Sequence, residues 1–243
     1  MAQTNNLTLS VPDGTSMQVF IASPEGTGPF PGLILFQEAF GVNAHIKDVA
    51  ERFAKEGYVV IAPELFHRTA PPGFEGPYGD FASIAPHFQG ITEAGLEADI
   101  TACWGWLQSQ ANLHKSKIAC TGYCLGGRVS FIANSILPFK AAVCYYGGRI
   151  VPDLLKRVPS LHAPMLFCWG GLDKHIPQEH VDAITTELKK ENKPYANIVF
   201  SYADHAFFCD ARPSYNPEAA AEAWALTLAF LKNKLNAKPT ATS

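Results

Sequence analysis

The chain has 243 residues, of which 47% are hydrophobic and only 17% are charged, so it can bury a sizeable core and is neither disordered nor fibrous. With 22 acidic and 19 basic residues the net charge is −3, and we expect no nucleic-acid partner. No apolar run approaches the roughly 18 residues that a transmembrane helix needs. The N-terminal segment does not resemble a secretory signal. We therefore expect a cytoplasmic protein without a membrane partner.

The first predicted elements form a hairpin, because strand patterns at 7–11 and 17–22 flank the turn formers Pro12, Asp13 and Gly14. Short apolar runs then alternate with segments of helical pattern. The runs predict strands near 32–37, 58–62, 117–121, 140–145, 164–169 and 197–202, and the intervals predict helices at 44–56, 93–111, 125–135, 178–191 and 217–235.

This alternation predicts an α/β fold whose central sheet is mostly parallel, with an antiparallel N-terminal hairpin and helices on both faces. No linker interrupts the series, so we expect one domain over 1–243. The Pro- and Gly-rich stretch 69–79 is typical of a long surface loop. The last residues, about 237–243, carry too little apolar area to order themselves, and we expect them to fray.

The cysteines and histidines indicate neither disulfides nor a metal site. Most of the six cysteines lie in apolar runs, as free thiols in a core do, and a chain of this length needs no disulfide framework. His175 and His180 are five positions apart, whereas a metal-binding pair on one helix face is four apart. We therefore predict no zinc site.

The segment Gly122-Tyr123-Cys124-Leu125-Gly126 has the pattern of a strand, a sharp turn and a helix. A nucleophile elbow of the G-x-S-x-G type needs this geometry, and here cysteine takes the place of serine. At a helix N-terminus the dipole favours a thiolate, and the amide of Leu125 can hold an oxyanion. The alternative is a structural cysteine in a tight turn.

A thiol nucleophile needs a base, and the base needs a carboxylate that orients it. Asp173 and His205 each follow a predicted strand, so they should reach the same carboxyl edge of the sheet as Cys124. The order nucleophile, acid, histidine is that of α/β-hydrolases. Asp204 ranks behind Asp173, because chain neighbours seldom point toward each other.

The loop after the strand near 32–37 supplies two further candidates. Ala39 has the natural second oxyanion amide. Glu38 would modulate the Cys124 thiol, by sharing its proton or by disfavouring the free thiolate. The equally acceptable alternative is a solvated glutamate at a strand end.

Five motifs, each near the end of a predicted strand, resemble the dienelactone hydrolase (carboxymethylenebutenolidase) family over about 7–232. They are Gln37-Glu38-Ala39-Phe40-Gly41-Val42-Asn43, Gly122-Tyr123-Cys124-Leu125-Gly126-Gly127, Tyr145-Tyr146-Gly147, Gly170-Gly171-Leu172-Asp173 and His205-Ala206-Phe207. The resemblance implies an α/β-hydrolase fold, a triad of Cys124, Asp173 and His205, and no cofactor. It also implies that Glu38 holds the resting thiol until a small ester or lactone arrives.

The departures from the family concern the substrate. Members that act on dienelactone bind its carboxylate with two arginines, one before the central helix and one after the histidine motif. Here 78–84 contains no arginine, and Cys209 occupies the second position. Arg212 lies three residues later and could substitute. The loss of two guanidinium contacts predicts a less charged ester or lactone.

Aromatic residues on loops could line an apolar pocket or simply pack in the core. These residues are Phe40, Phe66, Tyr78, Phe81, Phe88, Phe207 and Phe208. As candidate substrate contacts we predict Phe40, Tyr145, Phe207 and Arg212.

Two other functions remain open at this point. The fold could serve a small-molecule binding protein whose chemistry is idle, since fold alone does not establish activity. Cys124 could also be a redox-sensing thiol, because accessible cysteines of low pKa oxidise readily. All three triad residue types occur in the right order, which favours the hydrolase.

Overall fold

A computed structural model describes residues 2–236, so the predicted fraying of 237–243 lies outside the described residues. Eight strands form one sheet in the order β1-β2-β4-β3-β5-β6-β7-β8. They are β1 (Gln3–Ser10), β2 (Ser16–Ser23), β3 (Phe30–Phe36), β4 (Val59–Pro63), β5 (Leu113–Tyr123), β6 (Ala141–Tyr145), β7 (Met165–Gly170) and β8 (Tyr195–Phe200). The pairs β1–β2 and β2–β4 are antiparallel and the others are parallel, which confirms the predicted sheet and hairpin.

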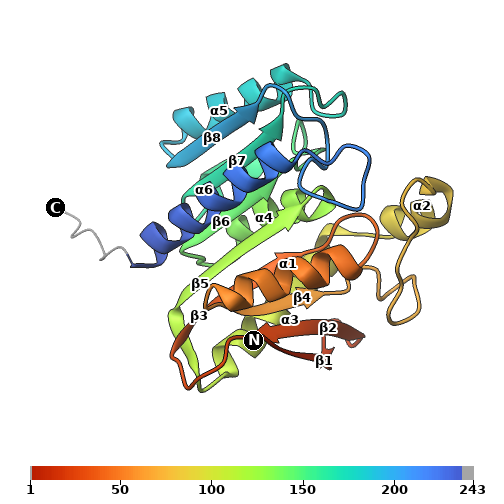
Figure 1. Cartoon of the computed structure of the whole chain (residues 1–243), viewed down its shortest axis with the longest axis vertical. Coiled ribbons are helices and arrows are strands. Elements are labelled where there is room, and N and C mark those ends of the chain that lie inside the picture. The colour runs from red at the N-terminus through yellow and green to blue at the C-terminus, as the bar shows by residue number, and fades with distance from the viewer. Residues whose placement is uncertain (1, 237–243) are drawn as a thin grey trace.

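Helices cover both faces of this sheet. They are α1 (Ala44–Lys55), α2 (Phe81–Gln89), α3 (Glu93–Ser109), α4 (Leu125–Ile136), α5 (Gln178–Lys190) and α6 (Pro217–Asn236), with a short 3-10 helix η1 (Leu155–Ser160). In Figure 1, α1 and α6 lie in front of the sheet and α3 and α4 lie behind it. Within residues 2–236, no helix has both the length and the apolar character needed to cross a membrane.

The side chains between these layers form the main hydrophobic core. The central strands β3, β4, β6 and β7 are buried along nearly their whole length, as expected of parallel strands covered on both faces. All six cysteines are free thiols, as predicted, and every one except Cys124 is buried. The outer strand β1 carries the polar sequence QTNN, which protects an exposed sheet edge from further pairing.

Helix α2 is an element that the sequence analysis did not predict. Asp80 caps its first turn by accepting a hydrogen bond from the Ser83 amide at 3.2 Å. Phe81, Ile84 and Phe88 recur at helical spacing, but Pro86 inside the helix hides that pattern. Figure 1 shows α2 to the right of the sheet, at the end toward which β5 points.

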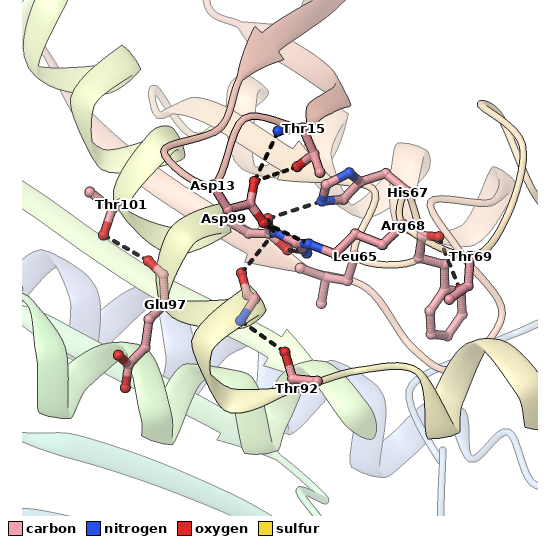
Figure 2. Close-up of polar contacts among 12 residues, drawn as sticks. Asp13, Thr15, Leu65, His67, Arg68, Thr69, Thr92, Glu97, Asp99 and Thr101 are labelled. Carbon is pink, nitrogen blue, oxygen red and sulfur yellow. Dashed lines mark hydrogen bonds and ion pairs between the residues drawn. The ribbon is translucent and has the colours of Figure 1, made fainter.

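An ionic cluster centred on the buried Asp99 joins the N-terminal hairpin to α3 (Figure 2). The Arg68 guanidinium lies between two carboxylates: it donates to Asp99 at 2.8 and 2.9 Å and to Asp13 at 2.6 and 2.9 Å. His67 Nε2 lies 3.0 Å from the same Asp99 carboxylate. Because Asp99 is fully buried, its carboxylate depends on the Arg68 guanidinium for charge compensation and on His67 for a further hydrogen bond.

Candidate active site

Cys124 lies at the sharp turn between β5 and α4. Its backbone has φ 55° and ψ −113°, a conformation that costs energy for any residue except glycine. Two glycines make the turn possible, because a Cβ at Gly122 would overlap the carbonyl oxygen of Gly126, and a Cβ at Gly126 would overlap that of Phe36. The turn therefore has the geometry that the elbow motif predicts.

The predicted acid and base meet at the carboxyl ends of β7 and β8. Asp173 Oδ2 lies 2.7 Å from His205 Nδ1, and Asp173 Oδ1 accepts a hydrogen bond from the His175 amide at 2.8 Å. Burial opposes ionisation of Asp173. The hydrogen bond and charge of His205, together with the His175 amide, outweigh burial and hold the pKa of Asp173 below its ordinary value.

His205 also faces Cys124. Burial disfavours the imidazolium, but hydrogen bonds to Asp173 and Cys124 and the negative charge of both partners raise the pKa of His205 to about 10. Cys124 and His205 line the same cavity. The structure thus brings together the three side chains that the sequence analysis selected.

Both predicted oxyanion donors also line this cavity, namely Ala39 and Leu125. Leu125 is the first residue of α4, so its amide has no carbonyl partner within the helix. The loop that carries Ala39 is fixed by Gln37, whose side-chain oxygen accepts from the Leu65 amide at 3.0 Å and whose nitrogen donates to the Glu38 carbonyl at 3.1 Å.

A small hydrophobic cluster, separate from the main core, supports the Ala39 loop. Its buried members are Ala39, Phe40 and Ile84, so it joins the loop after β3 to α2. Tyr78 packs against it, with ring centroids 4.7 Å from Phe40, and Phe88 packs on it from α2. We call this set the satellite cluster. It couples the position of one oxyanion amide to the segment that contains α2.

Glu38 is fully buried, so the alternative of a solvated glutamate is wrong. Within the described residues, neither carboxyl oxygen has a hydrogen-bond partner of ordinary geometry. Burial raises the pKa of Glu38 to about 7, although the positive charges of Arg212 and His205 and the nearby Cys209 thiol oppose the increase. The carboxyl group therefore changes its charge close to neutral pH.

Replacing Glu38 by glutamine is expected to change how stability depends on pH. The folded-state pKa of about 7 lies above the ordinary value of 4.5. The contribution of Glu38 to the free energy of unfolding is therefore fully present below pH 4.5 and is lost as the pH rises to 7. We expect the wild type to lose about 3 kcal/mol relative to Glu38→Gln between pH 4 and pH 8, at about 1.4 kcal/mol per pKa unit. Urea unfolding of both proteins at several pH values measures this, and a difference that is constant with pH would contradict it.

Glu38, His45 and Cys209 form the one group of possible metal ligands found among residues 2–236. One ligand atom from each lies within 4.8 Å of the others, and all three residues are buried. Burial lowers the pKa of His45 to about 4, so its imidazole is neutral at pH 7. A search for paired histidines could not find this group, because its members come from distant segments of the chain.

The cavity over Cys124 has a volume of about 430 Å³. It is lined by Ala39, Phe40, Phe81, Phe88, Cys124, Leu125, Arg128, Gly148, Arg149, His175, His205 and Arg212. Three phenylalanines give it an apolar wall, and three arginines give it positive charge. Of the predicted substrate contacts, Phe40 and Arg212 are in this lining.

Two predicted substrate contacts are wrong. Tyr145 is fully buried, and its hydroxyl lies 2.6 Å from Thr227 Oγ1 and 3.0 Å from the Ala223 carbonyl of α6, so it faces the helix instead of the cavity. Phe207 is also fully buried, with its ring 5.2 Å from those of Tyr146 and Phe200. In both cases the aromatic ring packs in the core, where it removes more apolar area from water.

The sequence analysis missed Arg128, Arg149 and His175. Each follows a strand end within a few residues: Arg128 is in the first turn of α4, Arg149 follows β6 and His175 follows β7. This is the same signal that selected Asp173 and His205, since loops at the carboxyl ends of parallel strands surround the ligand site. The search was limited to triad residue types and to two family arginine positions.

The comparison with known proteins decides the family. A family model described as "Dienelactone hydrolase family" matches residues 17–235. The chain belongs to the dienelactone hydrolase family. A "Putative carboxymethylenebutenolidase" of Yersinia pestis is 35% identical over 227 residues, which cover 87% of this chain and 81% of that protein. A protein of the same name from Escherichia coli (strain K12) is 36% identical over 239 residues, covering 92% and 85%.

Solved structures agree with this assignment. A "Putative Dienelactone Hydrolase" from Klebsiella pneumoniae is 30% identical, with a TM-score of 0.88 over 96% of this chain and 99% of that one. A puromycin-hydrolyzing peptidase of Mycobacterium tuberculosis is only 16% identical and shows a likeness of fold alone, with a TM-score of 0.76 over 100% of this chain and 41% of that one. The predicted α/β-hydrolase fold and the predicted hydrolase of the dienelactone hydrolase family are confirmed.

Proposed function

We propose that this member of the dienelactone hydrolase family hydrolyses a small ester or lactone through a Cys124–His205–Asp173 triad. The observation that carries the proposal is the contact of Cys124, on its strained elbow, with a histidine whose other nitrogen lies 2.7 Å from a buried carboxylate. Ala39 and Leu125, whose backbone amides are the candidate oxyanion donors, also line the cavity over Cys124. Together these groups make a complete acyl-transfer site.

In the proposed reaction the Cys124 sulfur attacks the substrate carbonyl carbon. The amides of Ala39 and Leu125 hold the negative oxygen of the tetrahedral intermediate. His205 then protonates the leaving oxygen as the bond to it breaks, which leaves a thioester on Cys124. His205 next takes a proton from water, and the hydroxide so formed releases the acid and restores the thiolate. Asp173 keeps the His205 tautomer correct throughout.

Glu38 modulates the nucleophile in this proposal. Its carboxyl group is fully buried, and the charges of Arg212 and His205, which line the cavity, both act on it. When ionised it competes with Cys124 for the positive charge of His205, and when protonated it does not. Since its pKa is about 7, the change occurs close to neutral pH.

Trapping the acyl-enzyme tests the proposed reaction. The wild type is mixed with excess p-nitrophenyl acetate, quenched in acid and analysed by intact-mass and peptide mass spectrometry. We expect one acetyl group on Cys124, more of it in His205→Gln because deacylation is slowed, and none in Cys124→Ala. If iodoacetamide alkylates Cys124 but no acetyl group is transferred, the result favours a binding protein without catalytic activity. If Cys124 reacts with neither reagent, the proposal is also rejected.

A further inference from the structure

Three donor groups of different chemistry meet below the surface: the Glu38 carboxyl, the His45 imidazole and the Cys209 thiol. One ligand atom from each lies within 4.8 Å of the other two, and each residue is at least nine-tenths buried. The three residues come from the loop after β3, the first turn of α1 and the segment between β8 and α6. The fold therefore brings together donors that are far apart along the chain.

Polar atoms of two of these groups are buried without compensation. Across residues 2–236, no hydrogen-bond partner of ordinary geometry reaches His45 Nε2 or either carboxyl oxygen of Glu38. A buried carboxyl and a buried imidazole without partners cost free energy, and an ion that binds both removes that cost. These atoms thus point to a ligand between them.

The donor set is one that zinc prefers. Zn²⁺ binds thiolate sulfur, imidazole nitrogen and carboxylate oxygen, with bonds of about 2.0 to 2.3 Å. Tetrahedral angles then place the donors about 3.5 Å apart, so atoms within 4.8 Å of one another need to move closer by about 1 Å or less. One carboxylate and one thiolate also balance the charge of a divalent ion, which suits a buried site.

Outer contacts already orient two of the donors. Asp210 Oδ1 lies 3.8 Å from His45 Nδ1, which leaves Nε2 for the ion, as in carboxylate–histidine–zinc arrangements. The Cys209 thiol donates to the Tyr78 hydroxyl oxygen at 3.3 Å. When zinc displaces the thiol proton, that proton passes to water, and the same hydroxyl can then donate to the sulfur.

A cleft that shares no lining residue with the catalytic cavity gives access to His45. Its volume is about 150 Å³, and Asp48 and Asp210 lie in its lining. The side chains of these aspartates are 60% and 74% exposed, so they can attract a cation from solvent. Arg52, which also lines the cleft, lies over the Trp224 ring at 4.4 Å. An ion can therefore enter without passing Cys124.

We propose that Glu38, His45 and Cys209 form a zinc site next to the active site. A water molecule completes the tetrahedron, as it does where a protein supplies three ligands. The inference goes beyond the proposed function and does not depend on it. In the proposed reaction Glu38 competes with Cys124 for the charge of His205, so an ion that holds Glu38 ends this competition. The spacing that argued against zinc considered only histidine pairs on one helix.

Cobalt titration tests the site, because Co²⁺ can occupy zinc sites and a cobalt–thiolate bond gives a charge-transfer band in the near-ultraviolet. The protein is Cys124→Ala, freed of metal with a chelator, so the proposed nucleophile cannot supply the thiolate. We expect one equivalent of Co²⁺ to produce the band and Zn²⁺ to abolish it. The band should be lost in Cys124→Ala, Cys209→Ala. It should remain in Cys124→Ala, Cys103→Ala, which removes another buried thiol.

Calorimetry with Zn²⁺ gives a second measurement that does not depend on the Cys209 variant. Glu38→Gln keeps the shape of one ligand without its charge and should weaken binding at least about 100-fold, and Asp210→Asn should weaken it about tenfold. Asp182→Asn, at an exposed acid outside the site, should leave it unchanged. Circular dichroism checks that each variant is folded. No band in Cys124→Ala, a band that survives Cys209→Ala, or equal affinity of Glu38→Gln and Asp182→Asn would overturn the inference.

Discussion

Replacing Asp173 by asparagine is expected to lower kcat for ester hydrolysis by roughly ten-thousandfold, with the fold retained. The carboxylate oxygen 2.7 Å from His205 Nδ1 accepts a hydrogen bond from that nitrogen and stabilises the imidazolium. An amide nitrogen in that place would donate instead and would force the wrong tautomer. The second oxygen, which accepts from the His175 amide, is preserved in asparagine, so the loop should keep its shape.

A matched variant distinguishes this effect from a local disturbance. Asp204 is the chain neighbour of His205 and accepts from its backbone amide at 2.6 Å, and Asp204→Asn keeps that acceptor. We expect Asp204→Asn to retain kcat within about threefold. NMR titration provides a second measurement, because the His205 pKa of about 10 depends on Asp173 and should fall in Asp173→Asn. Comparable losses in the two variants would contradict the triad.

The second large effect concerns stability. Asp99→Ala is expected to lower the free energy of unfolding by about 3–5 kcal/mol, the usual result of breaking a buried ionic cluster. The substitution leaves Arg68, whose side chain is 23% exposed, with Asp13 as its one carboxylate partner, and leaves His67 Nε2 without Asp99. Because the cluster joins the hairpin turn to α3, its loss should also loosen that edge of the sheet.

Urea unfolding tests this prediction through the urea concentration at the midpoint and the slope of the unfolding free energy against urea concentration. The control is Lys190→Ala, which removes ion pairs of a lysine that is 66% exposed and should leave the midpoint nearly unchanged. Activity of the folded Asp99→Ala protein should stay close to that of the wild type, since the cluster lies outside the cavity lining. An unchanged midpoint in Asp99→Ala would show that the charges contribute no net stability.

Most of the fold could be predicted because its elements have strong patterns. Buried parallel strands are short apolar runs, and the helices between them are amphipathic or capped, so the order of elements follows from periodicity. Helix α2 was missed because Pro86 breaks the expected pattern, although Asp80 and Gly90 mark its two ends. The burial of Tyr145 and Phe207 could not be predicted, since an aromatic residue at or after the end of a strand can turn toward the cavity or into the core.

The candidate triad was predictable for a topological reason. Residues after successive parallel strands meet at one edge, so Cys124, Asp173 and His205 could be brought together without knowledge of distances. The group formed by Glu38, His45 and Cys209 has no such signal, because its members meet through the packing of loops.

The satellite cluster separates the packing of the cavity wall from the packing of the main core. Its residues Phe40 and Ile84 are buried against each other but do not belong to the main core. Substitutions or insertions between 74 and 88 can therefore reshape the wall of the cavity, and shift the Ala39 amide, at little risk to the assembly of the sheet. Natural variation or directed evolution toward new esters would find its most tolerant starting point in this segment.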